Sequence, residues 1–144
     1  MTAGTRRPGR AYALQLLYAR DGDPATDVVG AAASWAEDFD LAIDPAAQAF
    51  ARELVAAASE HGERLDALIG AASKNWRIDR MSRVDRNILR LGACELVAFL
   101  DVPVRVVINE AVELAKRFGT AESSAFVNGV LDRIATAVGR HPDT

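Results

Sequence analysis

The chain has 144 residues, of which 50% are hydrophobic and 26% are charged, and its formal net charge is −3. This composition is typical of a folded globular domain, and a chain of this length can bury roughly two-thirds of its unfolded surface. No apolar run approaches the roughly 18 residues that a membrane-spanning helix requires. We therefore predict a single domain over residues 1–144 that is not inserted in a membrane.

Two features of the sequence bear on the location of the protein and on its cysteine chemistry. The basic N-terminus lacks the apolar segment of a secretory signal peptide, which favours a cytoplasmic protein. The single cysteine, Cys94, can form neither an intrachain disulfide nor a cysteine-rich zinc site. Because Cys94 lies in a strongly apolar helical pattern, we interpret it as a packed, unreactive thiol.

Charge is distributed unevenly along the chain. Residues 1–20 carry four arginines and no acid, whereas residues 21–69 carry eleven acids and two arginines. Residues 70–99 have six basic and three acidic side chains, and residues 100–144 have five basic and six acidic ones. The basic segments could hold a polyanion while the acidic segment discourages nonspecific contact. Solvated helix surfaces explain the same pattern, so charge alone leaves both interpretations open.

The N-terminal half shows helical periodicity and repeated helix-start signals. Pro8 and Gly9 precede the first amphipathic pattern, so residues 1–9 are expected to form a flexible basic arm. Aspartate followed by proline is a good pair for the N-cap and first helical position, and it occurs at Asp23-Pro24 and Asp44-Pro45. The first predicted helix has an apolar face of Ala11, Leu14, Leu17 and Tyr18; a later helix runs from Pro45 through Phe50 and Leu54 towards Gly62, and the next from about Glu63 towards Trp76.

The C-terminal half predicts three further helices. The first starts near Ser82, which can cap it, and is apolar over much of its circumference, so we expect it to lie centrally. The second follows Val102-Pro103 and stops at Gly119, which we expect in a left-handed C-terminal conformation. The third starts at Glu122 or Ser123, and residues 139–144 are expected to fray. The chain should therefore form about seven helices in one compact, all-α bundle.

Catalytic and metal-binding patterns are missing from the sequence. His61 and His141 are isolated from each other and from Cys94, so no metal-ligand spacing is present. No glycine-rich phosphate loop occurs, and acids on helical surfaces usually serve solubility. We predict that the protein is not an enzyme and uses no cofactor or metal.

Several short motifs follow one another in the C-terminal half. They are Val84-Asp85-Arg86-Asn87-Ile88-Leu89-Arg90, Glu95-Leu96, Asp101-Val102-Pro103, Ile108-Asn109-Glu110-Ala111-Val112-Glu113-Leu114-Ala115-Lys116 and Phe126-Val127-Asn128-Gly129-Val130-Leu131. Near the N-terminus stand Arg6-Arg7 and Arg10, followed by Ala13-Leu14-Gln15-Leu16-Leu17-Tyr18. Together these motifs resemble the NusB family of bacterial antitermination factors. Residues 21–60 are similar to the family in their acidic character only.

The resemblance implies an all-helical fold of two packed three-helix bundles. It also implies binding to the boxA RNA of ribosomal RNA leader transcripts together with NusE, the small-subunit ribosomal protein. Such a protein would act with RNA polymerase and the other Nus factors to suppress premature termination. The family has no catalytic activity and no cofactor.

The resemblance also places RNA contacts on particular residues. The family's arginine-rich segment corresponds to Arg6, Arg7 and Arg10, although Pro8 and Gly9 stand where more basic members continue the charge. The RNA-facing region around the last interhelical turn corresponds to Phe118, Glu122 and Phe126, and further basic contacts lie near Lys74 and Arg77. From pattern alone, Phe126 is also at core spacing with Val130, and Glu122 could simply cap its helix.

Tyr18 and Asp85 correspond to positions that the family uses to bind NusE. A packed core position explains Tyr18 nearly as well, and Asp85 could instead pair with Arg86 or Arg90 or act as a cap. Two other functions remain open: the N-terminal domain of an RNA methyltransferase that shares this fold, and a structural helical homodimer. Length argues against the methyltransferase, since we expect no catalytic domain after Thr144.

Overall fold

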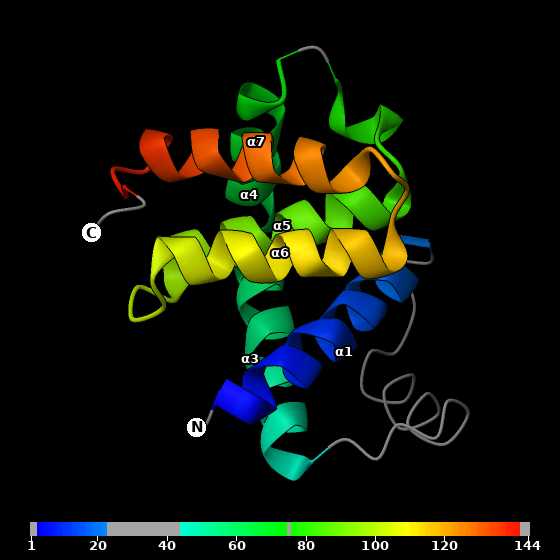
Figure 1. The fold of residues 1–144 in the computed structure, drawn as a ribbon, viewed down its shortest axis with the longest axis vertical. Helices are drawn as coiled ribbons and strands as arrows, with labels where there is room; N and C mark the ends of the chain where they lie inside the picture. The colour runs from blue at the N-terminus through cyan, green and yellow to red at the C-terminus, as the bar shows by residue number, and fades with distance from the viewer. Residues whose placement is uncertain (1–2, 23–43, 75, 142–144) are drawn as a thin grey trace. The chain divides into compact units, whose positions relative to one another are not determined.

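The computed structural model describes residues 3–22, 44–74 and 76–141, with side chains described from Arg6 onward. These residues form six α-helices and one short 3-10 helix and contain no strand, which confirms the all-helical prediction (Figure 1). The helix expected at Asp23-Pro24 lies outside the described residues. No helix in the described part of the chain is long and apolar enough to cross a membrane. The chain divides into two compact units, Met1–Ala56 and Ala57–Thr144.

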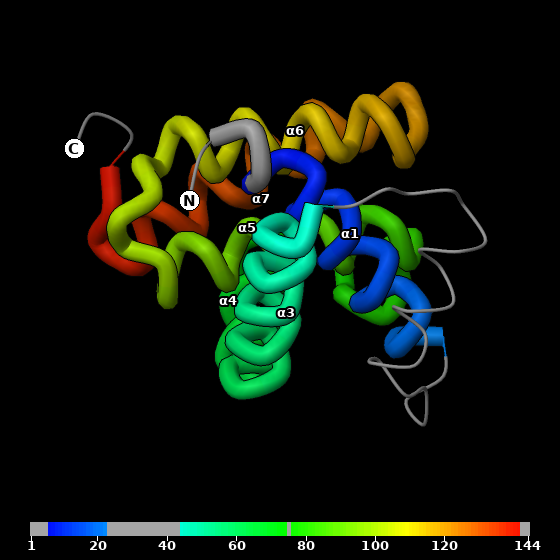
Figure 2. The backbone as a smooth tube through the Cα atoms, turned by 90° about the horizontal axis from the view of Figure 1, so that it is seen from below, coloured from blue at the N-terminus to red at the C-terminus, as the bar shows by residue number. Residues whose placement is uncertain are grey.

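The first unit contains α1 (Ala3–Gly22) and most of α3 (Pro45–Glu60). Figure 2 shows α1 lying against α3. Gly9 lies where α1 contacts α3. A Cβ atom added at Gly9 would lie 2.9 Å from Phe50 Cδ2 and 3.0 Å from the Ala47 carbonyl oxygen. Packing around Phe50 therefore holds the first half of α1 against α3. Ala3–Gly9 is helical, whereas the sequence predicts a flexible arm over residues 1–9.

Two predicted helix starts are confirmed by their capping hydrogen bonds. Asp44 Oδ1 accepts a hydrogen bond from the backbone N–H of Ala46 at 2.9 Å, and α3 begins at Pro45. Ser82 Oγ accepts from the backbone N–H of Asp85 at 3.1 Å, immediately before α5. Each side chain satisfies a backbone donor that has no partner within its own helix.

The second unit is built from α4 (Gly62–Ala72), the 3-10 helix η1 (Ile78–Arg80), α5 (Arg83–Ala98), α6 (Val104–Phe118) and α7 (Ser123–Ala137). Helices α5, α6 and α7 contact one another, and α4 packs on α5 and α7. Every residue of α5 from Asn87 to Leu96 except Arg90 is buried, as expected for a central helix. Gly92 allows α7 to approach closely, since a Cβ atom there would lie 2.6 Å from Leu131 Cδ1.

Polar contacts attach α4 to its two neighbours. The Arg90 guanidinium on α5 pairs with Asp66 on α4 through two hydrogen bonds, of 2.9 and 3.2 Å. Arg133 on α7 donates from Nε to the Ala72 carbonyl oxygen, in the last turn of α4, at 2.6 Å. These contacts hold the end of α4 and the loop that follows it.

The end of α7 is ordered by a glycine and an arginine. Gly139 has a φ of 78°, and the N–H of Arg140 donates to the Ala135 carbonyl oxygen at 2.8 Å, which is the Schellman arrangement of a helix end. The Arg140 guanidinium donates to the carbonyl oxygens of Leu96 and Val102 at 3.1 and 2.7 Å. The sequence predicts fraying from residue 139, but Gly139 and Arg140 are held by these bonds.

Candidate nucleic-acid interface

The turn between α6 and α7 brings three of the predicted RNA contacts into one short segment. Phe118 is the last residue of α6, Glu122 immediately precedes α7, and Phe126 lies in the first turn of α7. Ser123 Oγ accepts from the backbone N–H of Thr120 at 2.9 Å, which fixes the turn. The Thr120 hydroxyl donates to Glu122 Oε2 at 3.2 Å. Glu122 makes no side-chain cap on α7, so its carboxylate faces the turn instead.

Gly119 in this turn is required for a different reason from the one predicted. Its φ of −96° and ψ of −164° are extended, so the prediction of a left-handed conformation is wrong. A Cβ atom on Gly119 would lie 2.5 Å from Ser123 Oγ and 2.9 Å from the Ala115 carbonyl oxygen. The turn folds back so tightly that no side chain fits at this position.

The two aromatic side chains of the turn differ in their surroundings. The Phe118 ring is 36% exposed, and the Arg117 guanidinium lies 4.9 Å from its centroid. Phe126 is half-buried, and its neighbours Val127 and Val130 are fully buried. Phe126 therefore contributes to the core and keeps part of its ring at the surface. Both rings offer faces on which unpaired bases can stack.

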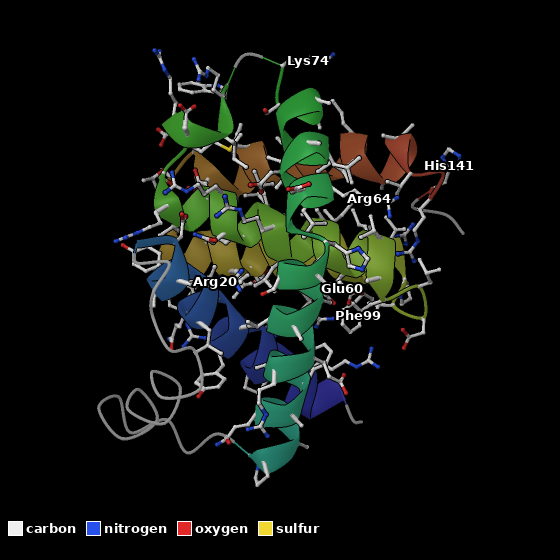
Figure 3. The ribbon with its side chains drawn as sticks, turned by 180° about the vertical axis from the view of Figure 1, so that it is seen from behind. Arg20, Glu60, Arg64, Lys74, Phe99 and His141 are labelled. Atoms are coloured by element: carbon white, nitrogen blue, oxygen red, sulfur yellow. The ribbon has the colours of Figure 1, made fainter. Side chains whose placement is uncertain are left out.

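Lys74 and Arg77 belong to the loop between α4 and η1. Lys74 is exposed and has a φ of 49°, in the left-handed region that favours glycine. Figure 3 shows its side chain extending outward from the end of α4. Arg77 is exposed and pairs with Asp79, with Nε 3.3 Å from Oδ1 and Nη2 3.3 Å from Oδ2.

The three predicted N-terminal arginines lie on α1 in different environments. Arg7 is exposed and Arg6 is half-buried. Arg10 is only 4% exposed, although the resemblance implies an RNA contact there. The guanidinium groups of Arg6 and Arg10 each lie 5.6 Å from the centroid of the Phe50 ring. Arg10 therefore packs within the first unit, and Arg7 is the member of the group that faces solvent.

The two predicted partner contacts occupy different units. Tyr18 on α1 is 37% exposed, so its ring is not a fully packed core residue. Asp85 is half-buried in the first turn of α5. Its Oδ1 atom is buried and accepts no hydrogen bond within the described residues. Arg90, one of the pairing partners considered for Asp85, is engaged with Asp66.

Side chains with chemical reactivity do not gather in the described residues. No three of the histidine, cysteine and acidic side chains described here lie close enough together to hold a metal ion. Cys94 is fully buried, and desolvation, followed by the charge of Glu95, raises the pKa of its thiol to about 12. Such a thiol stays protonated at neutral pH and is a poor nucleophile.

Trp76 is an exposed residue to which the sequence motifs assign no function. Its side chain is 56% exposed, in the same loop as Lys74 and Arg77. One sequence signal could have identified it: an indole without a helical register, standing in a segment rich in basic residues.

Comparison with known proteins identifies relatives over nearly the whole chain. Residues 7–136 match the model of the NusB family. The transcription antitermination protein NusB of Myxococcus xanthus is 51% identical over 138 residues, which cover 95% of this chain and 99% of that protein. The protein of the same name from Sorangium cellulosum is also 51% identical, over 139 residues covering 95% of this chain and 96% of that protein.

Solved structures show the same fold. The T. maritima NusB structure superposes with a TM-score of 0.81 at 36% identity, covering 96% of this chain and 94% of that one. A structure of antitermination factors NusB and NusE in complex with dsRNA gives a TM-score of 0.80 at 31% identity, covering 94% of this chain and 99% of that one. The predicted NusB-like fold is thereby confirmed.

Proposed function

This chain belongs to the NusB family, and from that premise we propose that it is a transcription antitermination factor. It binds the boxA RNA of ribosomal RNA leader transcripts together with ribosomal protein NusE. The observation that carries this proposal is the agreement over nearly full length, at 51% identity, with proteins named for antitermination. Because both of these relatives are named as antitermination proteins, this assignment is favoured over the N-terminal domain of a methyltransferase.

The turn between α6 and α7 is the proposed centre of the RNA site. Phe118 and Phe126 receive unpaired bases on their exposed ring faces, and the Glu122 carboxylate accepts a hydrogen bond from a base amino group. The bond between Thr120 and Glu122 and the close fit of Gly119 support this role, because they hold the turn in one conformation before RNA arrives.

Basic side chains supply the electrostatic part of the interaction. Arg7, Lys74 and Arg77 are exposed and attract phosphates, whereas the acidic residues 21–69 disfavour indiscriminate RNA binding. Arg6 adds to this field from a half-buried position. We assign Arg10 a mainly structural role on Phe50, since its guanidinium is nearly inaccessible to phosphate.

NusE is the proposed protein partner. The exposed ring of Tyr18 offers apolar area and a hydroxyl group, a combination that is common at interfaces. We propose that NusE also contacts Asp85, which is half-buried in the first turn of α5. The complex then acts with RNA polymerase and the other Nus factors in the cytoplasm, by binding alone, without catalysis or a cofactor.

Substitutions in the α6–α7 turn test the RNA site. Phe126→Leu preserves the buried part of the side chain but removes the aromatic face, so boxA affinity should fall about tenfold. Fluorescence anisotropy with labelled boxA RNA and a base-scrambled RNA measures this change, and a thermal melt verifies the fold. Exposed Glu113→Gln on α6 serves as the control. Unchanged boxA affinity in Phe126→Leu, or equal binding of the scrambled RNA by the unsubstituted protein, would contradict the proposed site.

A further inference from the structure

An open pocket lies where α4 ends and η1 begins. Its volume is about 400 Å³, within the range of sites that hold small planar ligands. The residues that line it are Gly70, Lys74, Trp76, Arg77, Ile78 and Asp79. Gly70 leaves part of the pocket open, since a Cβ atom added there would meet nothing within 4 Å. The pocket is therefore bordered by Trp76 and by three charged side chains, those of Lys74, Arg77 and Asp79.

The backbone that carries Trp76 is fixed before any ligand binds. Ser73 Oγ donates to the carbonyl oxygen of Trp76 at 2.7 Å, and the Trp76 N–H donates to the Ser73 carbonyl oxygen at 3.2 Å. Arg133 donates a hydrogen bond to the carbonyl oxygen of Ala72, the residue before Ser73. The indole is nonetheless 56% exposed, so a large apolar ring is presented to solvent from an anchored loop. Such a surface binds a flat ring with little loss of conformational entropy.

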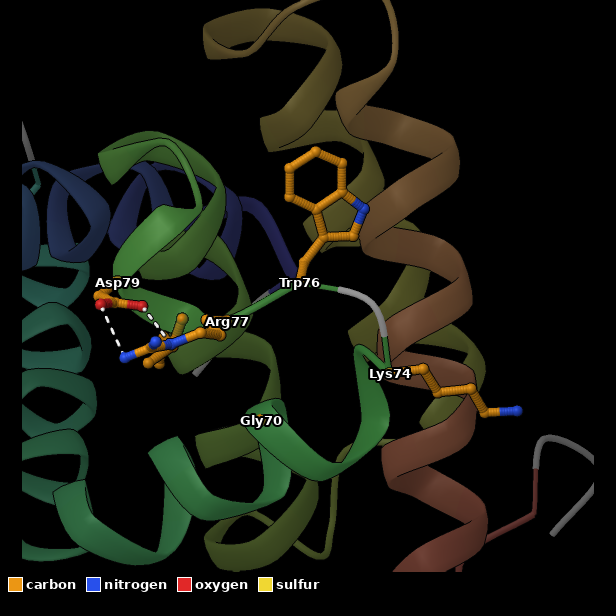
Figure 4. A pocket seen from close by; sticks show the side chains of 6 residues that line it. Gly70, Lys74, Trp76, Arg77 and Asp79 are labelled. Atoms are coloured by element: carbon orange, nitrogen blue, oxygen red, sulfur yellow. Dashed lines mark hydrogen bonds and ion pairs between the residues drawn. The ribbon is translucent and has the colours of Figure 1, made fainter.

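Charge around the indole favours an anionic ligand. Residues 74–84 carry four basic side chains and one acidic side chain, a net charge of +3. In the view of Figure 4, Lys74 and the Arg77–Asp79 pair leave the loop on opposite sides of Trp76. Arg77 binds Asp79 through Nε and Nη2, so its Nη1 atom takes no part in this pair. A ring stacked on Trp76 would thus have a cation on either side.

The conformation of Lys74 is a second, independent sign of a ligand site. It directly follows the C-cap of α4, Ser73, with a φ of 49°, and glycine is favoured at such a position. A lysine there costs backbone stability, and strained residues of this kind concentrate at functional sites. Glycine would be more stable at this position, but the chain has a lysine, which is exposed beside the pocket.

We propose that Trp76 is a stacking platform for one unpaired base of single-stranded RNA, with Lys74 and Arg77 Nη1 contacting the phosphates that flank this base. An aromatic face accepts any base, and cations on both sides follow the sugar–phosphate chain. This inference rests on the proposed function and extends the RNA path to a second aromatic contact, away from the α6–α7 turn in the sequence. It assigns Trp76 to RNA and not to NusE.

Affinity measurements on substituted full-length protein with NusE and boxA RNA test this inference. Trp76→Ala should weaken RNA binding about tenfold, and Trp76→Phe should retain most of the affinity. Leu100→Ala, which truncates another exposed apolar side chain of the same unit, should bind as the unsubstituted protein does. Lys74→Gly should weaken RNA binding and reduce its salt dependence without lowering the melting temperature, because glycine relieves the strained backbone.

Quenching of tryptophan fluorescence supplies direct information on stacking. The chain has two tryptophans, so Trp35→Phe leaves Trp76 as the reporter. RNA that stacks on the indole should quench this emission, whereas an abasic oligonucleotide of the same length should not. The proposal is overturned if the emission is insensitive to RNA, or if Trp76→Ala binds RNA normally.

The outcomes separate this inference from the proposed function. If Trp76→Ala binds boxA RNA normally while Phe126→Leu loses affinity, the stacking role falls and the RNA-binding function stands. If Trp76→Ala loses NusE affinity but keeps RNA affinity measured without NusE, the surface belongs to the protein partner and the stacking role is again overturned. If the unsubstituted protein binds no RNA, both proposals fall.

Discussion

Burial, more than position in the sequence, decides what the individual arginines of this protein can do. Arg6, Arg7 and Arg10 lie within one turn and a half of α1, yet Arg7 faces solvent and Arg10 is 4% exposed. Phe50, on α3, lies under the guanidinium groups of Arg6 and Arg10. Its contact with α1 joins segments far apart in the sequence, so no local pattern could have distinguished the three residues.

Substituting Arg7 and Arg10 should therefore give opposite profiles. Arg10→Ala should lower the free energy of unfolding by about 1 kcal/mol, because it removes a cation–π contact and the packing of the side-chain stem. Arg7→Ala should leave stability unchanged and weaken boxA binding. Urea unfolding and RNA anisotropy on both variants measure the two effects. Equal losses of stability, or a loss of RNA affinity confined to Arg10→Ala, would refute this division of roles.

Cys94 provides a probe of burial within α5. Its pKa is raised to about 12, so the thiol stays neutral in the folded protein where an unfolded chain would ionise near 9.0. The stability that this neutral thiol contributes is complete below pH 9.0 and is lost as the pH rises towards 12. Iodoacetamide at pH 8 should label the folded protein far more slowly than the protein in denaturant, as mass spectrometry can follow.

The alkaline loss of stability supplies the control for Cys94. Cys94→Ala should remove part of the decline in unfolding free energy above pH 9.0. The remainder includes Tyr12, whose pKa burial also raises. Rapid labelling of the folded protein at pH 8 would mean that α5 is not packed as described.

At the scale of helices and turns, local sequence signals predicted starts better than ends. Asp44-Pro45 and Ser82 cap their helices as expected, because a start signal acts through a side chain on its own backbone. Helix ends depend on contacts with other parts of the fold. Gly119 is needed for close approach to Ser123. Arg140 donates to the carbonyl oxygens of Leu96, near the end of α5, and of Val102, in the α5–α6 connection.

Gly119→Ala should destabilise the protein through this close approach. Ser123 Cβ would lie 2.6 Å from the new methyl carbon, so the turn must open. We expect a loss of about 1–3 kcal/mol in unfolding free energy and weaker boxA binding, since the turn carries Phe118 and Glu122. Gly70→Ala on α4, where the added atom meets nothing, should instead stabilise by about 0.5–1 kcal/mol.

Thermal and urea unfolding of these two glycine variants provide the comparison. Opposite shifts in the unfolding free energy of the two variants would show that steric contact at the glycine, and not the loss of a glycine as such, determines the change in stability. A Gly119→Ala protein as stable as the unsubstituted one would show that the turn tolerates a side chain and that its geometry differs from the one described.

At the scale of the whole molecule, helical periodicity predicts the fold class but not the function. The apolar faces and caps indicate an all-α protein, and the described helices agree. The assignment of RNA and NusE contacts depended instead on motifs such as Ile108-Asn109-Glu110 and Phe126-Val127-Asn128-Gly129, because an exposed phenylalanine or carboxylate has no periodic signature. Trp76 has no periodic signature either: its basic surroundings are the sequence signal for it, and its exposure is known only once its loop is placed.

The net charge of −3 makes the partner central to this account. A chain that is acidic overall gains little from nonspecific attraction to RNA, so affinity must come from the local basic surfaces and from a second protein that adds to them. NusE, docked through Tyr18 and Asp85, is proposed to extend the RNA-binding surface. The RNA and protein contacts should therefore reinforce each other, as linked binding equilibria require.

Titration of labelled boxA RNA with this protein, with and without saturating NusE, tests the central claim most directly. The account predicts that NusE raises boxA affinity by about tenfold or more, that a base-scrambled RNA gains much less, and that Tyr18→Ala removes the gain. An affinity for boxA that is the same with and without NusE, or the same for the scrambled RNA, would contradict it.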